Sequence, residues 1–314
     1  MTDDEMLEEE TVRPFVVPIN DEFAAQAAAA LRHYRELVEN AFSDGWEPAA
    51  GSPFVADTAC NEAVADPVGS ARGSLYAMLL DIAGLSWSTA LDHVRALEHD
   101  ITRKPPPVWS PLVSARAVLE SCLFLQYLIE PSISCGLRLA RCAGLWRKDV
   151  QHSTQAARVF GAEQEAEAAD LDAYVTQALA DANVSERSNA QGRITGYEVD
   201  GEVSSLDYKI TDRAKAALPS WVPMPYAILS GAAHGRPWMT GSTRRGADET
   251  DGALVGEAAT VMTALMVVMA SLEMCLAAWQ GFFGADLNET FTELEEHRSQ
   301  AFMYLLGLAH AADD

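Results

Sequence analysis

The sequence predicts an all-α fold, a multi-helix bundle with a small polar insertion at residues 184–203. Two observations indicate this: apolar residues recur at helical spacing through most of the chain, and Gly, Pro and polar capping residues separate the periodic segments. The length of 314 residues is enough for one large helical domain. We expect residues 1–19 to form an acidic, flexible leader and residues 20–314 a single all-helical domain.

The helices of the first half are predicted from their caps and breaks. Asn20 caps a helix that ends near Gly45, and residues 45–67 look like a loop. A helix from about Val68 is expected to break at Gly84. Further helices are predicted from Ser86 through Ile101, and then, beyond the stiff connector Pro105–Pro107, over residues 110–130, 133–150 and 153–182.

The second half begins with the polar insertion. Its segment Tyr197–Val203 predicts a β-hairpin that turns at Asp200 and Gly201, because this dipeptide favours a tight turn. Beyond it we expect short helices at residues 205–217 and 223–234, a flexible stretch at 239–250, and long helices at 251–283 and 286–310.

Composition limits the classes of function. The formal charge of −24 and the pI near 4.5 argue against general binding to nucleic acid or anionic membranes, because the mean field repels phosphate. Arg makes up 18 of the 22 basic residues and Ala is abundant, which indicates a GC-rich, bacterial coding bias. The five cysteines form no CxxC pair, which fits a reducing compartment, and the acidic N-terminus has no secretion signal. We therefore expect a cytoplasmic protein.

One segment is apolar enough to raise the question of a membrane. Residues 258–279 carry a single charge, at Glu273, and are about as long as a membrane span. The preceding flank is acidic, without the Lys and Arg that orient a membrane helix. We expect a central helix of the bundle and no membrane partner.

Two pairs of polar residues stand in otherwise apolar helices. Arg116 and Glu120 are four residues apart, so they share one helix face, and Ser230 and His234 have the same spacing in a helix that Gly235 ends. Unpaired charge is costly to bury, so these four side chains should meet partners. They are our candidate catalytic or binding residues, with the two helices facing each other across a central polar pocket.

Each pair has a structural and a functional interpretation. Arg116 and Glu120 either form an ion pair that locks a helix, or Arg116 binds an anionic group that Glu120 helps to orient. His234 is either a hydrogen-bonded core histidine or an acid–base group at a helix C-terminus. A Ser–His pair on one helix lacks the nucleophile elbow and oxyanion donors of hydrolases, so Ser230 is a weak nucleophile candidate.

Other motifs are weaker. The chain has no HExxH, P-loop or GxGxxG motif, so we expect neither a metal nor a nucleotide cofactor. A basic island is either a phosphate- or RNA-attracting surface or a helix face that pairs with acids elsewhere. Its residues are Arg138, Arg141, Arg147, Lys148 and Arg158.

The motifs Arg116-x-x-x-Glu120 and Tyr226-x-x-Leu-Ser230-Gly-x-x-His234-Gly resemble those of a broad group of uncharacterised bacterial helical proteins, distant relatives of the HEPN superfamily. That resemblance implies a helical bundle, frequent pairing of two copies, and either ribonuclease activity or non-catalytic nucleotide binding. Catalytic HEPN proteins share an Arg-x4–6-His motif. Here Arg147 and His152 fit that spacing, whereas no Arg precedes His234 by four to six residues.

Three functions therefore stay open. The leading hypothesis is a non-catalytic or cryptic HEPN-like homodimer in stress or phage defence. The second is a metal-independent ribonuclease with His152 or His234 as general acid or base, and Arg147 or Arg116 stabilising a phosphate. The third is a binder or enzyme for a small anionic metabolite held by Arg116.

Overall fold

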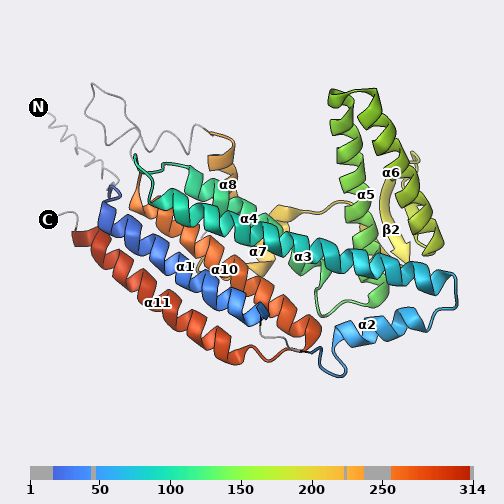
Figure 1. Cartoon of the computed structure of the whole chain (residues 1–314), viewed down its shortest axis with the longest axis horizontal. Helices are drawn as coiled ribbons and strands as arrows, with labels where there is room; N and C mark the ends of the chain where they lie inside the picture. Colours follow the sequence, from blue (N-terminus) through green and yellow to red (C-terminus); the bar gives the residue numbers. More distant parts are fainter. Residues whose placement is uncertain (1–16, 44–46, 223–224, 237–255, 312–314) are drawn as a thin grey trace, which may run out of the picture.

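The computed structural model describes residues 17–43, 47–222, 225–236 and 256–311, so most of the predicted leader and the predicted flexible stretch at 239–250 lie outside the described residues. The described part contains ten helices and one three-stranded sheet, which confirms the predicted all-α class with a small polar insertion (Figure 1). The helices are α1 (Asp21–Ser43), α2 (Pro53–Glu62), α3 (Val68–Ile101), α4 (Ser110–Leu128), α5 (Cys135–Phe160), α6 (Ala162–Asp181), α7 (Ile210–Ala217), α8 (Pro225–Ala233), α10 (Ala258–Phe283) and α11 (Asn288–Ala311).

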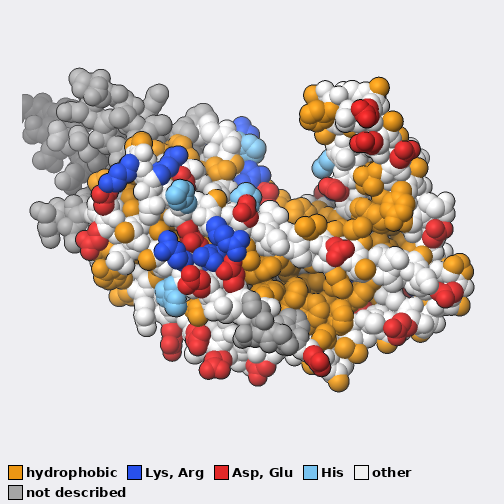
Figure 2. Space-filling model, in the orientation of Figure 1, with side chains coloured by type: hydrophobic (Ala, Val, Ile, Leu, Met, Phe, Trp, Pro, Cys, Tyr) orange, Lys and Arg blue, Asp and Glu red, His pale blue; other side chains and the backbone are white. Residues whose placement is uncertain are grey.

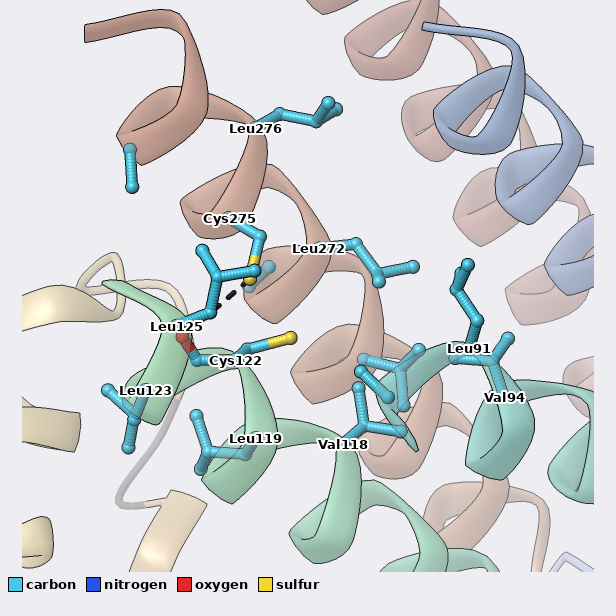
Figure 3. Packing of buried hydrophobic residues seen from close by; sticks show 14 of the residues in the cluster. Leu91, Val94, Val118, Leu119, Cys122, Leu123, Leu125, Leu272, Cys275 and Leu276 are labelled. Carbon is cyan, nitrogen blue, oxygen red and sulfur yellow. Dashed lines mark hydrogen bonds between the residues drawn. The ribbon is translucent and has the colours of Figure 1, made fainter. Parts of the chain in front are cut away.

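Helix α4 lies at the centre of the bundle. It packs against α3 on one side and α10 on another, and Figure 3 shows apolar side chains of all three helices meeting. Val118, Leu119 and Cys122 of α4 are fully buried there, facing Leu272 and Cys275 of α10. Burying an aliphatic side chain of this size is worth about 1.5–3 kcal/mol, so this three-helix contact is a main source of stability.

Helix α10 is the apolar segment that raised the question of a membrane. Its mean hydropathy reaches 2.0 over an 18-residue window, and α3 is also long and apolar enough to cross a membrane. Two thirds of that window of α10 is buried inside the protein. Its charged residue, Glu273, accepts hydrogen bonds from Tyr34 of α1 and Arg298 of α11. These contacts give the single charge protein partners and tie the three helices together.

The basic island of α5 proves to be largely structural. Arg138 is fully buried, its Nε donates to Asp57 of α2 at 2.7 Å, and its other nitrogens donate to the carbonyl oxygens of Leu128, Glu130 and Ile133 at 2.8–3.2 Å. Carbonyl groups at a helix C-terminus have no partner within the helix. Arg138 therefore caps the end of α4 and joins it to α2.

Two further members of the island have acidic partners. Arg141 donates to the carbonyl of Tyr127 and to the Glu130 carboxylate at 2.7 and 2.6 Å, and Arg147 pairs with Asp172 of α6 at 2.7 Å. Lys148 bonds to the carbonyl of Leu206, and Arg158 is exposed. For Arg138, Arg141 and Arg147, the pairing with acids elsewhere is confirmed, and it opposes the alternative of a phosphate-attracting surface. The sequence could not separate the two because the acids lie on other elements.

A three-stranded antiparallel sheet packs on α5. Its strands are β1 (Ser185–Ser188), β2 (Ile194–Val199) and β3 (Glu202–Ser205), and β2 and β3 form the predicted hairpin. Asp200 and Gly201 turn it with φ of 54° and 84°, left-handed values that suit these residues. Arg72 of α3 donates to both oxygens of Asp200 at 2.7 Å, which ties the turn to the bundle.

Three predicted boundaries are wrong. Helix α3 runs unbroken through Gly84 because packing outweighs the cost of one helical glycine, about 1 kcal/mol. Residues Pro53–Glu62 form α2, which Ser52 caps, where a loop was expected. The break predicted at 151–152 lies instead at Gly161, whose φ of 112° ends α5.

We predict that Arg138→Met lowers the free energy of unfolding by about 3–5 kcal/mol, because it leaves the buried Asp57 carboxylate and several carbonyl groups without a donor. Arg158→Met, at an exposed position of the same helix, is the matched control and should change stability by less than about 0.5 kcal/mol. Urea unfolding of the two variants measures both values. Equal stabilities would contradict the capping role of Arg138.

We also predict a pH-dependent contact between α1 and α11. The Nε2 of His297 donates to the carbonyl of Ala30 at 2.9 Å, and burial, with the neighbouring His33, lowers the pKa of His297. The unfolded chain therefore takes up this proton first, so stability is lost as the pH falls below the unfolded value of about 6.5. His297→Gln should lose less stability between pH 7.5 and 5.5 than the wild type. The exposed control His99→Gln should keep the wild-type loss.

Candidate functional site

The first predicted polar pair meets one member of the second, His234. Helix α8 packs on α4 (Figure 1). This packing brings Tyr226 and His234 to Arg116. Arg116 Nε donates to Glu120 Oε1 at 2.7 Å, Arg116 Nη1 lies 3.3 Å from His234 Nε2, and Arg116 Nη2 donates to the Tyr226 hydroxyl at 3.2 Å. The Tyr226 hydroxyl in turn donates to Glu120 Oε1 at 3.1 Å. We call these four residues the Arg116 cluster.

The position of His234 follows from how α8 ends. Gly235 has a φ of 57°, and the amides of Gly235 and Arg236 donate to the carbonyls of Ala232 and Gly231 at 3.2 and 2.9 Å. This pair of bonds is a Schellman motif, the common end of a helix with a left-handed glycine. The motif holds His234 immediately after the last residue of α8, where its ring reaches Arg116.

The electrostatics of the cluster keep Arg116 charged. Partial burial lowers the pKa of Arg116, but the hydrogen bond and the negative charge of Glu120 outweigh it, so the net shift is upward. Burial and the charge of Glu120 also raise the pKa of Tyr226, which keeps its hydroxyl protonated. A guanidinium group only donates, so His234 Nε2 accepts from Arg116 and the neutral ring carries its proton on Nδ1.

The cluster is partly open to solvent. The side chains of Arg116 and Glu120 are 20% and 30% exposed, and His234 is exposed. The prediction that the two helices face each other is confirmed by these contacts. The central polar pocket between them stays a prediction.

Three other candidate residues, Ser230, Arg147 and His152, are not part of the Arg116 cluster. Ser230 is half-buried on α8, one turn from both Tyr226 and His234, but in the described structure its hydroxyl makes no hydrogen bond to His234. Arg147 faces Asp172 of α6, whereas His152, five residues on, is exposed at a pocket between α3, α4 and α5. Five residues turn a helix by about 140°, so the structure does not bring Arg147 and His152 together.

Tyr226 was missed as a site residue, although its spacing could have revealed it. Tyr226, Ser230 and His234 follow one another at intervals of four, so they lie along one stripe of α8. Its ring also lies beside the guanidinium, with Arg116 Cζ 5.4 Å from the ring centre. Tyr226 thus orients Arg116 through both its hydroxyl and its ring.

No protein-family model, curated protein or solved structure matches this chain.

The chemistry available to the cluster follows from these contacts. Arg116 presents a planar fork of donors, and three of its five N–H groups have partners among the described residues. His234 adds an imidazole ring beside it, and Glu120 and Tyr226 restrict the orientation of the guanidinium. Such a set can bind a carboxylate or phosphate, and an imidazole next to it can transfer a proton.

We predict that Gly235→Ala destabilises the end of α8 that positions His234, although Gly235 is not part of the Arg116 cluster. A side chain at a left-handed position costs about 1–2 kcal/mol, whereas Asn tolerates that conformation, so Gly235→Asn is the matched control. Apart from its chain neighbours and the backbone of α8, no described atom lies within 4 Å of a Cβ added at Gly235, so a steric clash with the described residues would not account for the loss. Chemical denaturation should show a larger loss in the free energy of unfolding for Gly235→Ala than for Gly235→Asn. Equal stabilities of the two variants would contradict the Schellman end of α8.

Proposed function

We propose that this protein is a binding module, HEPN-like in its helical frame and non-catalytic or cryptic, that holds the acidic group of a small anionic ligand at the Arg116 cluster. The observation that carries the proposal is the contact of 3.3 Å between Arg116 Nη1 and His234 Nε2, which joins two distant parts of the chain. The mostly helical architecture supports the HEPN-like frame. The proposal does not depend on the pair Arg147 and His152.

The physical reason for an anion is the preorganised guanidinium. Glu120 and Tyr226 orient Arg116 before any ligand arrives, so little side-chain entropy is lost on binding. An acidic group that approaches from the exposed side meets the remaining Arg116 N–H groups and the ring of His234. Glu120 neutralises part of the positive charge of Arg116, so we expect moderate affinity for the anion. The fixed orientation of the guanidinium should select anions by their geometry.

A second candidate, RNA cleavage without a metal, is favoured by one feature of the same cluster. A guanidinium, an imidazole and a carboxylate lie within hydrogen-bond distance of one another or of a common partner. Phosphodiester cleavage needs a cation on the phosphate and a proton donor and acceptor beside it. The formal charge of −24 opposes RNA binding, which is why this function comes second.

The test is thermal unfolding in the presence of inorganic phosphate, citrate and adenosine monophosphate, each at millimolar concentration. We expect at least one of these anions to raise the unfolding temperature, and Arg116→Gln to abolish the rise because the charged fork is lost. Arg193→Gln removes an exposed arginine from the loop before β2 and should keep the wild-type response.

Two results would overturn the binding proposal. One is no response to any of the anions, and the other is the same response in the Arg116→Gln variant. A labelled RNA oligonucleotide tests the second candidate: fragments formed by the wild type in EDTA and not by His234→Gln would make the protein a ribonuclease.

A further inference from the structure

The outer half of the α5–α6 pair carries a groove that shares no residue with the Arg116 cluster. Gly161 joins the two helices at the free end of the pair, which stands clear of the other described elements in Figure 1. The groove lies between the two helices near this end and has a volume of about 320 Å³. We call it the α5–α6 groove.

Two matching stripes of residues line the α5–α6 groove. On α5 they are Ser153, Ala156, Ala157 and Phe160. On α6 they are Gln164, Glu167, Ala168 and Leu171. Each set follows the spacing i, i+3, i+4 and i+7, which places side chains along one face of a helix. Two such faces side by side form a seam into which a third helix can pack, and the small alanines allow a close approach.

Large apolar side chains at this surface are open to solvent. Phe160, at the outer end of the groove, is 73% exposed, and Leu171 on the opposite helix is 40% exposed. One turn further along α6, Tyr174 is 63% exposed and contacts the ring of Trp146. Figure 2 shows hydrophobic and acidic side chains together on the visible side of this pair. A contiguous apolar surface bordered by charge is typical of a site that binds another protein.

The charges beside the groove are negative. Glu167 lines it, and Glu163 and Asp170 lie four residues before and three residues after Glu167, so all three exposed acids share one side of α6. The arginines of α5 lie elsewhere. Arg147 and Arg158 are three helical turns apart on a common side of α5, and neither is among the described residues that line the groove.

We propose that the α5–α6 groove is a docking surface for a basic amphipathic helix of a partner protein. The apolar face of that helix packs between Phe160 and Leu171, and its Lys and Arg side chains pair with Glu163, Glu167 and Asp170. Charge decides against a second copy of this chain as the occupant, because a second copy would bring the same acids against each other, and like charges across an interface repel.

The experiment measures the binding of a labelled peptide to the full chain by fluorescence anisotropy. The probe is a peptide of about 18 residues, built of Leu and Lys, with its leucines at the spacing i, i+3, i+4 and i+7. One comparison peptide has Glu in place of Lys, and another has the same composition with Leu and Lys in strict alternation, which removes the apolar helix face. We expect micromolar affinity for the probe and at least tenfold weaker binding of both comparison peptides.

Two pairs of variants locate the binding site. Phe160→Ser should weaken binding of the probe at least tenfold, whereas Val159→Ser, at the neighbouring exposed position outside the groove, should bind it as the wild type does. Glu167→Lys should weaken binding at least fivefold, and Glu165→Lys, the same charge change outside the groove, less than twofold. All four side chains are exposed, so none of these variants disturbs the core.

Three results would overturn the proposal. The first is equal binding of the probe and either comparison peptide. The second is an equal loss in each variant and its control, which would mean that net charge alone attracts the probe. The third is a dimer in sedimentation equilibrium that Phe160→Ser dissociates and Val159→Ser does not, which would make a second copy the occupant. Arg116→Gln should bind the probe as the wild type does, which separates this surface from the Arg116 cluster.

Discussion

The structure depends on the burial of α4, a helix that carries charge on one side and is apolar on the others. Its apolar sides pack against α3 and α10, and its last carbonyl groups are capped by Arg138 from α5. Because its apolar sides and its C-terminal end are fixed by these contacts, the polar side of α4, with Arg116 and Glu120, lies toward α8. The pairing of that side with Tyr226 and His234 follows from this arrangement.

Two arginines of this protein have different roles, and the degree to which each side chain is buried distinguishes them. Arg138 is fully buried, and four of its five N–H groups donate to acceptors of the protein. Arg116 is 20% exposed, has partners for three of its five N–H groups among the described residues and lies beside an exposed imidazole. A fully buried arginine with most of its donors satisfied stabilises a fold, whereas a partly satisfied one at the surface can bind an anion.

The α5–α6 pair extends the bundle. It rises from α3 in Figure 1, and the small sheet packs on α5. The hairpin turn is tied back to α3 through Arg72 and Asp200. This contact anchors the extension at its base.

Local patterns alone determined much of this protein: the helical class, the hairpin at Asp200 and Gly201, and the spacing that put Arg116 with Glu120 and placed His234 at the end of α8. Those features depend on neighbours within a few residues, through backbone preference and helical geometry. Only the tertiary structure decided that the two polar helices touch, that Arg138 is a cap and not a phosphate ligand, and that α3 passes through Gly84. Each of these depends on partners far away in the chain, and no local spacing specifies which acid or carbonyl group a buried arginine will meet.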